Sequence, residues 1–203
     1  MERGREGGSG ACGVRCVGSL PPHGLPAPLR YNKGMLQPLC SALLEKIREE
    51  IERSTHLLDL LPELPLDWTP PIPDARPVGW LMGHMLECLA GFCAVLYAVR
   101  PEALAHFERL KALPVNHLCG TDEARRRIAD YAACIDEGMS LLQDSDLACR
   151  VPTVFVPEGE LLLTLLLGNL EHLINHKYQL LIYLKLAGVA AGTRDVYQFR
   201  GER

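Results

Sequence analysis

Four long stretches of this chain repeat apolar residues every three or four positions, and this periodicity constrains the fold more than any other feature. Such spacing places apolar side chains on one face of a helix. Proline interrupts a helix, so the segment "LPELPLDWTPPIPDARP" marks a long connection between the first two stretches. The repeating residues of the first stretch are Leu36, Leu39, Leu43, Ile47, Ile51 and Leu58.

The later stretches carry helix start and stop signals. The second predicted helix runs from about Pro77, a residue suited to the first helical turn, to about Val99. Thr121 or Asp122 is expected to cap the third helix. The apolar stripe of this third helix is Ile128, Tyr131, Ile135, Met139 and Leu142.

The fourth predicted helix begins near Pro157 and runs to Ala187, and Gly188 ends it as the C′ residue. The preceding link, "DSDLACRVPTVFVPEG", is expected to be irregular or briefly extended. No β-rich stretch is long enough to build a sheet. The pattern predicts an all-α four-helix bundle with a small irregular tail at the C-terminus.

The length of 203 residues suits one domain with a single core, and 48% hydrophobic content is typical of a globular protein. The net charge is −4, with acidic and basic residues mixed along the chain, and aromatic residues make up only 6%. Neither a basic patch nor a platform for stacking bases is expected. This composition argues against nucleic-acid binding.

The chain contains eight cysteines but no CxxC pair, and several of them fall inside apolar helical patterns. Free cysteines in such positions behave as small hydrophobic residues. The N-terminus lacks the apolar segment of a secretory signal. A reducing, cytoplasmic location is therefore predicted.

The apolar stretch from Gly79 to Val99 is long enough to cross a membrane, but it contains His84 and Glu87. Ionisable groups are costly in a bilayer and usually indicate function or a protein interior. We interpret the stretch as the central helix of a soluble bundle, with a membrane helix as the alternative.

Residues 1–34 are rich in Gly, Pro and Arg and show no hydrophobic period, which predicts a disordered tail before a domain at 35–203. Met35 opens the first periodic stretch, so the tail is alternatively a misassigned start. A transit peptide is a further reading, against which its glutamates count. Cys12 and Cys16 have metal-like spacing but no partners. The tail is expected to be dispensable for folding.

Two histidines, His172 and His176, lie four residues apart in the leucine-rich stretch "GNLEHLINHKYQLLIYLKLAG". Residues at this spacing share one helix face, and a helix can in this way offer two imidazoles to one metal ion. The stripe through them is apolar in its upper part, so the histidines are expected to face the interior. The members of that stripe are Leu161, Leu165, Gly168, His172, His176, Gln179 and Tyr183.

A third ligand is expected from the second helix, where His84 interrupts an otherwise apolar stripe through Leu81 and Cys88. Gly83, Gly91 and Gly168 are expected to leave space beside the histidines. Three imidazoles with an open fourth position are typical of catalytic zinc, although nickel and iron also accept imidazole. The alternative for each histidine is a hydrogen-bonded core residue without a metal.

Other polar residues are weaker candidates for the site. Cys88 could be a ligand or nucleophile, but a buried structural cysteine is the favoured interpretation. Glu87, Glu171 and Asn175 could orient a ligand, whereas solvated positions are commoner for such residues. His56 is expected at the surface or its boundary. His106 and His117, in the connection before the third helix, are expected in solvent.

The stretches "GWLMGHMLECLAGF" and "LLGNLEHLINHKYQLLIYLKLAG" together resemble the DinB-like (DinB/YfiT) superfamily of metal-dependent enzymes. In that family a proline-rich linker precedes the helix with the first His, and the last long helix carries HxxxH, a Gln and a YL(K/R)xxG ending. Family members often have a basic pair around the third ligand, where this chain has Lys177 after His176. The matching elements here are "WTPPIPDARP", His84, His172, His176, Gln179 and Tyr183-Leu184-Lys185 ending at Gly188.

The resemblance covers roughly residues 35–200 and implies an up-down-down-up four-helix bundle. It also implies a divalent metal, most often zinc or nickel, on the three histidines. Family members include thiol-dependent S-transferases and a thiol-dependent isomerase. Thiol transfer to an electrophilic small molecule is thus the first expected chemistry, with a low-molecular-weight thiol as cosubstrate, and metal-assisted hydrolysis is the second.

The alternative is a non-catalytic metal- or ligand-binding bundle, such as a stress-response protein. The chain has no Ser-His-Asp signature, phosphate-binding glycine loop or dinucleotide fingerprint to suggest another enzyme class. The wide apolar face of "LLLTLLLGNL", residues Leu161 to Leu170, further predicts a homodimer.

Overall fold

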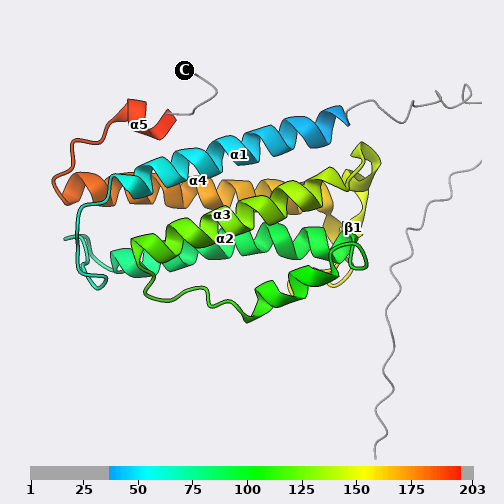
Figure 1. Cartoon of the computed structure of the whole chain (residues 1–203), viewed down its shortest axis with the longest axis horizontal. Helices are drawn as coiled ribbons and strands as arrows, with labels where there is room; N and C mark the ends of the chain where they lie inside the picture. The colour runs from blue at the N-terminus through cyan, green and yellow to red at the C-terminus, as the bar shows by residue number, and fades with distance from the viewer. Residues whose placement is uncertain (1–36, 198–203) are drawn as a thin grey trace, which may run out of the picture. The chain divides into compact units, whose positions relative to one another are not determined.

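The computed structural model describes residues 37–197, and this part of the chain is all-α apart from one very short hairpin (Figure 1). The tail predicted at residues 1–34, and Leu36 of the first stripe, lie outside the described residues. The four long helices are α1 (Pro38–Asp59), α2 (Val78–Val99), α3 (Thr121–Ser140) and α4 (Leu162–Leu186). The shorter elements are η1 (Ala105–Ala112), η2 (Asp144–Ala148), β1 (Arg150–Val151), β2 (Glu160–Leu161) and α5 (Thr193–Tyr197).

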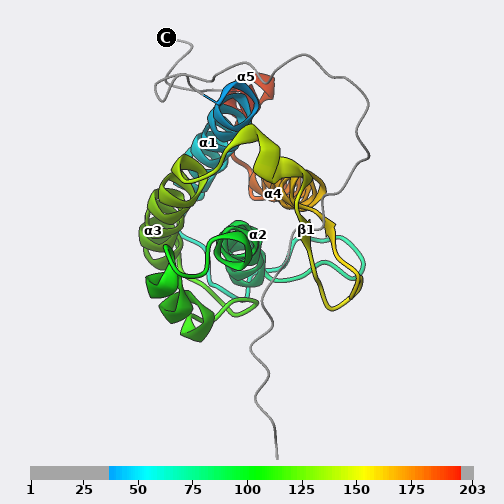
Figure 2. The same cartoon turned by 90° about the vertical axis from the view of Figure 1, so that its right-hand side faces the viewer.

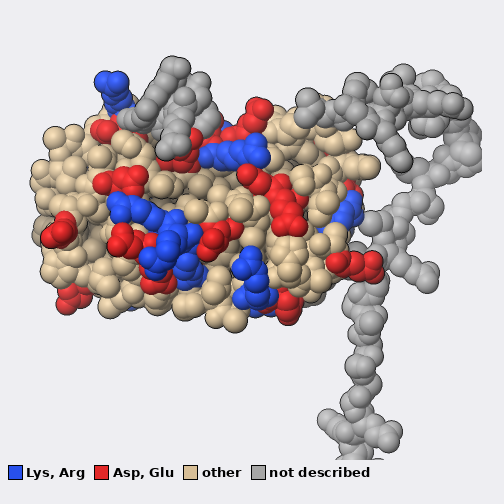
Figure 3. All heavy atoms as spheres, viewed as in Figure 1, with Lys and Arg blue, Asp and Glu red and all other residues tan. Residues whose placement is uncertain are grey.

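Each long helix packs against two others. Helix α1 contacts α3 and α4, and α2 contacts the same two helices, so α1, α3, α2 and α4 follow one another around the core (Figure 2). Ion pairs Arg48–Asp136 (2.7 Å) and Arg125–Asp59 (2.6 Å) show that α1 and α3 are antiparallel. Helix α2 runs with α3 and against α4 (Figure 1). On the face shown in Figure 3, basic and acidic side chains are intermixed.

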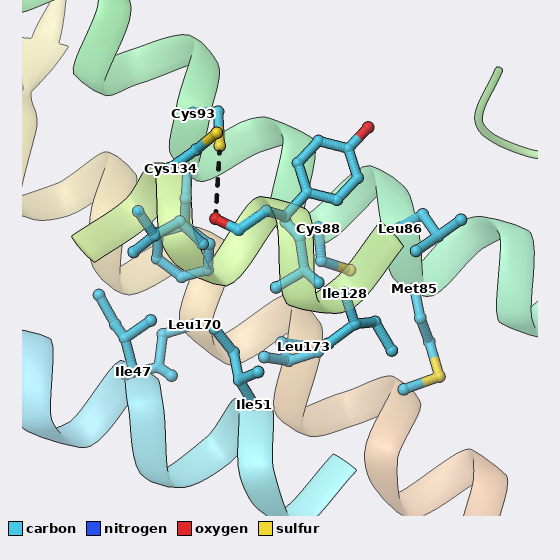
Figure 4. Packing of buried hydrophobic residues seen from close by; sticks show 14 of the residues in the cluster. Ile47, Ile51, Met85, Leu86, Cys88, Cys93, Ile128, Cys134, Leu170 and Leu173 are labelled. Carbon is cyan, nitrogen blue, oxygen red and sulfur yellow. Dashed lines mark hydrogen bonds between the residues drawn. The ribbon is translucent and has the colours of Figure 1, made fainter. Parts of the chain in front are cut away.

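The core is formed by apolar side chains from all four long helices. Figure 4 shows Ile47 and Ile51 of α1 facing Leu170 and Leu173 of α4, with residues of α2 and α3 above them. The predicted stripe of the third helix is confirmed, since every one of its members is buried. In the first stripe, by contrast, Leu39 is 62% exposed, because it lies in the opening turn of α1, beyond the packed part of the helix.

Three predicted helix boundaries are wrong, two by one or two residues and one by five. Pro77 is the N-cap of α2, not its first residue, and Gly120 is the N-cap of α3 without any side-chain cap from Thr121. Helix α4 begins at Leu162 and not near Pro157, because the residues before it pair with β1 as the second strand of the hairpin. The predicted C′ glycine is confirmed: Gly188 has a φ of +83°, which favours glycine.

Helix α2 is the one helix among residues 37–197 that is long and apolar enough to cross a membrane by length and composition. The core helix of a soluble protein meets the same criteria. Here α2 packs between α3 and α4, and Leu81, Leu86, Phe92 and Leu96 are fully buried within it. This packing is consistent with the interpretation of α2 as a central helix.

A buried ion-pair network fixes the rotation of α4 against α1. Lys177 is only 1% exposed, and its Nζ donates to Glu50 Oε2 at 2.5 Å. Glu50 also accepts from Lys46 at 2.9 Å and from Arg53 at 3.0 Å. Consecutive residues on a helix point about 100° apart. With Lys177 held on α1, the preceding His176 is turned towards α2.

Candidate metal centre

The three predicted ligands lie together at the α2–α4 contact. The rings of His84 and His172 are 5.0 Å apart between centroids, those of His84 and His176 are 4.5 Å apart, and those of His172 and His176 are 4.7 Å apart. One nitrogen from each ring lies within 4.8 Å of the others. The three histidines make up the whole of this group of candidate ligands within residues 37–197.

The histidines stand at the edge of the core and not inside it, which corrects the predicted orientation. All three are half-buried, and Leu161 at the top of their stripe is 40% exposed. Only Tyr183 of that stripe is buried. The main core face of α4 lies a fraction of a turn away, and it consists of Leu162, Leu166, Leu170, Leu173, Lys177, Leu180 and Leu184. Because Lys177 takes the core position, the imidazoles are displaced towards solvent and remain accessible.

Hydrogen bonds fix which nitrogen of His84 faces the other rings. Its Nδ1 lies 2.5 Å from the Asn116 side-chain oxygen and 2.9 Å from a Glu87 carboxylate oxygen. Both neighbours are acceptors, so Nδ1 carries the proton and Nε2 keeps its lone pair. Metal-binding histidines are usually oriented by such an outer acceptor.

A chain of three hydrogen bonds fixes His176 in the same way. The Tyr183 hydroxyl donates to the Arg76 carbonyl at 2.8 Å, and its oxygen then accepts from the Gln179 amide nitrogen at 3.4 Å. This turns the Gln179 amide oxygen towards His176 Nδ1, which it meets at 2.9 Å. Nδ1 of His176 is thus the donor, and its Nε2 is free to bind a metal.

The spacing of the nitrogens fits a divalent ion. Nε2 of His172 lies 3.2 Å from Nε2 of His84. Tetrahedral zinc with nitrogen ligands at 2.0–2.1 Å would separate neighbouring ligands by about 3.3 Å. Burial lowers the pKa of both His172 and His176 and neighbouring histidines lower it further, which favours the neutral imidazoles that bind metals.

One wall of the site is aromatic. The Trp80 indole stacks on His84 with centroids 4.6 Å apart and planes inclined by 20°, and the Arg76 guanidinium lies 5.3 Å from the indole centroid. The indole limits the movement of the His84 ring, so it can swing little from its position facing α4.

Open space was predicted at Gly83, Gly91 and Gly168, but only one of these glycines has it. A Cβ on Gly91 would lie 2.5 Å from Asn169 Oδ1, and one on Gly83 would lie 2.1 Å from the His117 carbonyl oxygen. These two glycines admit neighbouring groups and not a ligand. A Cβ on Gly168 would meet nothing within 4 Å, so the prediction of space holds there.

The weaker candidates are placed as follows. The buried Cys88 thiol contacts the His84 carbonyl at 3.7 Å, and Glu171 and Asn175 are exposed. His56 and His106 pair with carboxylates elsewhere, on Asp195 and Glu137 respectively. His117 is half-buried and bonded to Glu123 at 3.0 Å, so its expected solvation is wrong.

Sequence reasoning missed Asn116, which supplies one of the two acceptors on His84. Its backbone φ of +56° is uncommon outside glycine, and Asn tolerates it better than most residues. A turn at "PVNH" was the available signal. The pairing with His84 could not be read from it, because the two residues are 32 positions apart.

No family model, curated protein or solved structure matches this chain. The resemblance to the DinB-like superfamily therefore rests on the motifs themselves and stays a prediction.

The Gln179 hydrogen bond gives a test of the site that spares the ligands. We expect Gln179→Leu to weaken zinc binding about 10- to 100-fold, as loss of an outer partner usually does. Gln179→Glu keeps an oxygen for His176 Nδ1 and should retain near-normal affinity. Competition with a chromogenic chelator measures both variants. Equal affinity of Gln179→Leu and the unchanged protein would contradict the assigned role.

Proposed function

We propose that this protein is a metal-dependent enzyme of the DinB-like class, with one divalent ion held by His84, His172 and His176. The observation that carries the proposal is the orientation of the rings. Two independent sets of acceptors bind Nδ1 of His84 and of His176, which leaves the Nε2 atom of each ring free for a metal. The proposed fold is the up-down-down-up four-helix bundle. It is supported by the order and directions of the four long helices.

Zinc or nickel is the proposed ion, since neutral imidazole suits both. When bound, such an ion lowers the pKa of a thiol or a water and so supplies a nucleophile at neutral pH. Acceptors on Nδ1 orient the His84 and His176 rings, and burial lowers the pKa of His172 and His176. Trp80 limits the motion of the His84 ring. The Glu87 carboxylate, which is 43% exposed, contacts Nδ1 of the same ring.

The proposed reaction is transfer of a low-molecular-weight thiol to an electrophilic small molecule, in which a carbon–sulfur bond forms as the leaving group departs. Metal-assisted hydrolysis is the second proposed chemistry. The partial exposure of the three histidines supports access for a reactant. A closed structural site would instead surround its metal with four protein ligands.

Cobalt substitution tests whether a thiol can reach the ion. We expect a small thiol to increase the thiolate-to-cobalt absorption of the cobalt-loaded protein. The increase should be absent in the His172→Ala, His176→Ala double variant. A pre-existing band that Cys88→Ala removes would mean that the site is closed by its own cysteine, and it would contradict the enzyme proposal.

A homodimer is proposed from the outer face of α4. Leu163, Leu167, Ile182 and Leu186 are each 38–48% exposed, and they repeat along the side of the helix away from the core. We expect light scattering to give the dimer mass, and the monomer mass for Leu163→Glu, Leu167→Glu. A monomer mass for the unchanged protein at high concentration would contradict the prediction.

A cytoplasmic location is also proposed. Cys40, Cys88, Cys93, Cys119 and Cys134 are free and buried, which supports a reducing compartment.

A further inference from the structure

A second group of metal-binding side chains lies beside α2, at the start of α3. One ring nitrogen of His117, Sγ of Cys119 and a carboxylate oxygen of Glu123 lie within 4.8 Å of one another. None of these residues belongs to the three-histidine group. We call them the His117 cluster.

The backbone holds this cluster firmly against α2. The Asn116 N–H donates to the Gly83 carbonyl at 3.1 Å, and the Cys119 N–H donates to the Gly79 carbonyl at 2.9 Å. A Cβ on Gly83 would lie 2.1 Å from the His117 carbonyl oxygen, so only glycine permits this approach. Residues 115–120 thus form a strap whose position is fixed before any ligand binds.

Within the strap, the polar atoms of the cluster are incompletely paired by protein. His117 Nε2 bonds to Glu123 at 3.0 Å, but its Nδ1 is buried and has no hydrogen-bond partner among residues 37–197. The Cys119 side chain is fully buried, and its thiol makes a 3.5 Å contact with the adjacent Gly120 carbonyl. A buried ring nitrogen without a protein partner leaves a position for water or an ion at this half-buried imidazole.

We propose that His117, Cys119 and Glu123 bind a second divalent ion, with zinc favoured because a thiolate, an imidazole and a carboxylate are all zinc ligands. The ion displaces the thiol proton of Cys119 and binds one ring nitrogen of the neutral His117 imidazole and a carboxylate oxygen of Glu123. The resulting thiolate and carboxylate balance its two positive charges. Arg127 also approaches Glu123, at 3.3 Å, but it has partners of its own in the Pro114 carbonyl and the Tyr131 hydroxyl.

Solvent and ions can reach the cluster through an adjoining cavity. A cavity of about 460 Å³ lies between the linker that precedes α2 and the first turn of α3, and Glu123 is one of its lining residues. Thr121 and Asp122 line it as well. The cavity therefore reaches the cluster at Glu123, the one cluster residue that lines it.

The location of the cluster assigns this ion a structural role. Asn116 lies next to His117 on the strap and bonds to His84 Nδ1 at 2.5 Å. An ion on His117 and Cys119 would fix the residues that directly follow Asn116, which orients His84. Loss of the second ion is therefore expected to weaken metal binding at the three histidines without removing any of their ligands.

Cobalt titration of the full chain tests the proposal. We expect about two equivalents per chain, one for each site, and a thiolate-to-cobalt band before any thiol is added. Cys119→Ser should lose the band and one equivalent. The matched control is Cys134→Ser, which alters a buried cysteine of α3 and should keep both.

This experiment tests the two proposed sites independently of each other. The His172→Ala, His176→Ala variant should lose one equivalent but keep the band, so absence of metal at the histidines would leave the His117 cluster visible. If Cys119→Ser does not fold by circular dichroism, Glu123→Gln replaces it and should weaken the band-forming site at least tenfold. A single equivalent without the band, or a band that neither variant changes, would overturn the second site.

Discussion

The His172→Ala, His176→Ala double variant is expected to lose one equivalent of divalent metal per chain, with all metal-dependent activity. It removes two of the three imidazoles that lie within 4.8 Å of one another and leaves His84 alone, which is too few ligands for a stable site. Elemental analysis after dialysis measures the loss. The helical content should stay unchanged, because both side chains lie at the edge of the core and not within it.

The matched control is His106→Ala, which removes an exposed histidine that bonds to Glu137 at 3.0 Å. It should keep its metal in full. A second readout is stability: a metal present at 100 times its dissociation constant adds about 2.7 kcal/mol to the free energy of unfolding. The double variant should lose the part of this stabilisation that the three-histidine site supplies. Metal content unchanged from that of His106→Ala would refute the assignment of ligands.

The second large effect is expected at the buried ion-pair network between α1 and α4. Glu50→Ala should lower the free energy of unfolding by about 3–5 kcal/mol, because it leaves a buried charge without its counter-ion. Lys177 is 1% exposed, and its other hydrogen bond is donated to the Val196 carbonyl at 3.5 Å. Urea unfolding followed by circular dichroism measures the change.

Two variants separate the ion pair from simple loss of packing. Glu45→Ala removes an exposed carboxylate of the same helix and should cost less than about 1 kcal/mol. Glu50→Leu, Lys177→Met replaces both charges by apolar groups of similar size and should recover most of the loss. A cost below about 1 kcal/mol for Glu50→Ala would contradict the network's role.

The same network predicts a response to acid. Burial by itself raises the pKa of Glu50, but the hydrogen bonds from Lys177 and Lys46 outweigh it and hold the pKa below its ordinary value. A lowered folded-state pKa contributes stability above the ordinary value, about 4.3, and that stability is lost as the pH falls through the folded pKa. Glu50→Leu, Lys177→Met should lack this part of the acid dependence.

The sequence by itself determined the helical class and indicated the three candidate histidines. Periodicity located four long helices, because a helix that buries one face needs apolar residues every three or four positions, whatever it packs against. Four-residue spacing also placed His172 and His176 on one face, and His84 was predicted from its position in an apolar stripe; the structure brings the three together. The stripe of α3 and the terminal Gly188 followed from the same local rules.

Only the tertiary structure decided how α4 is rotated and what holds the imidazoles. Local spacing does not distinguish a core stripe from a neighbouring one, and the pairing of Lys177 with Glu50, 127 residues away, selects between them. The hydrogen bond from His84 to Asn116 likewise depends on residues 115–120, which can approach α2 closely because Gly83 lacks a side chain. Contacts between residues far apart in sequence leave no period in the chain, because each depends on one pair of side chains and not on a repeating face.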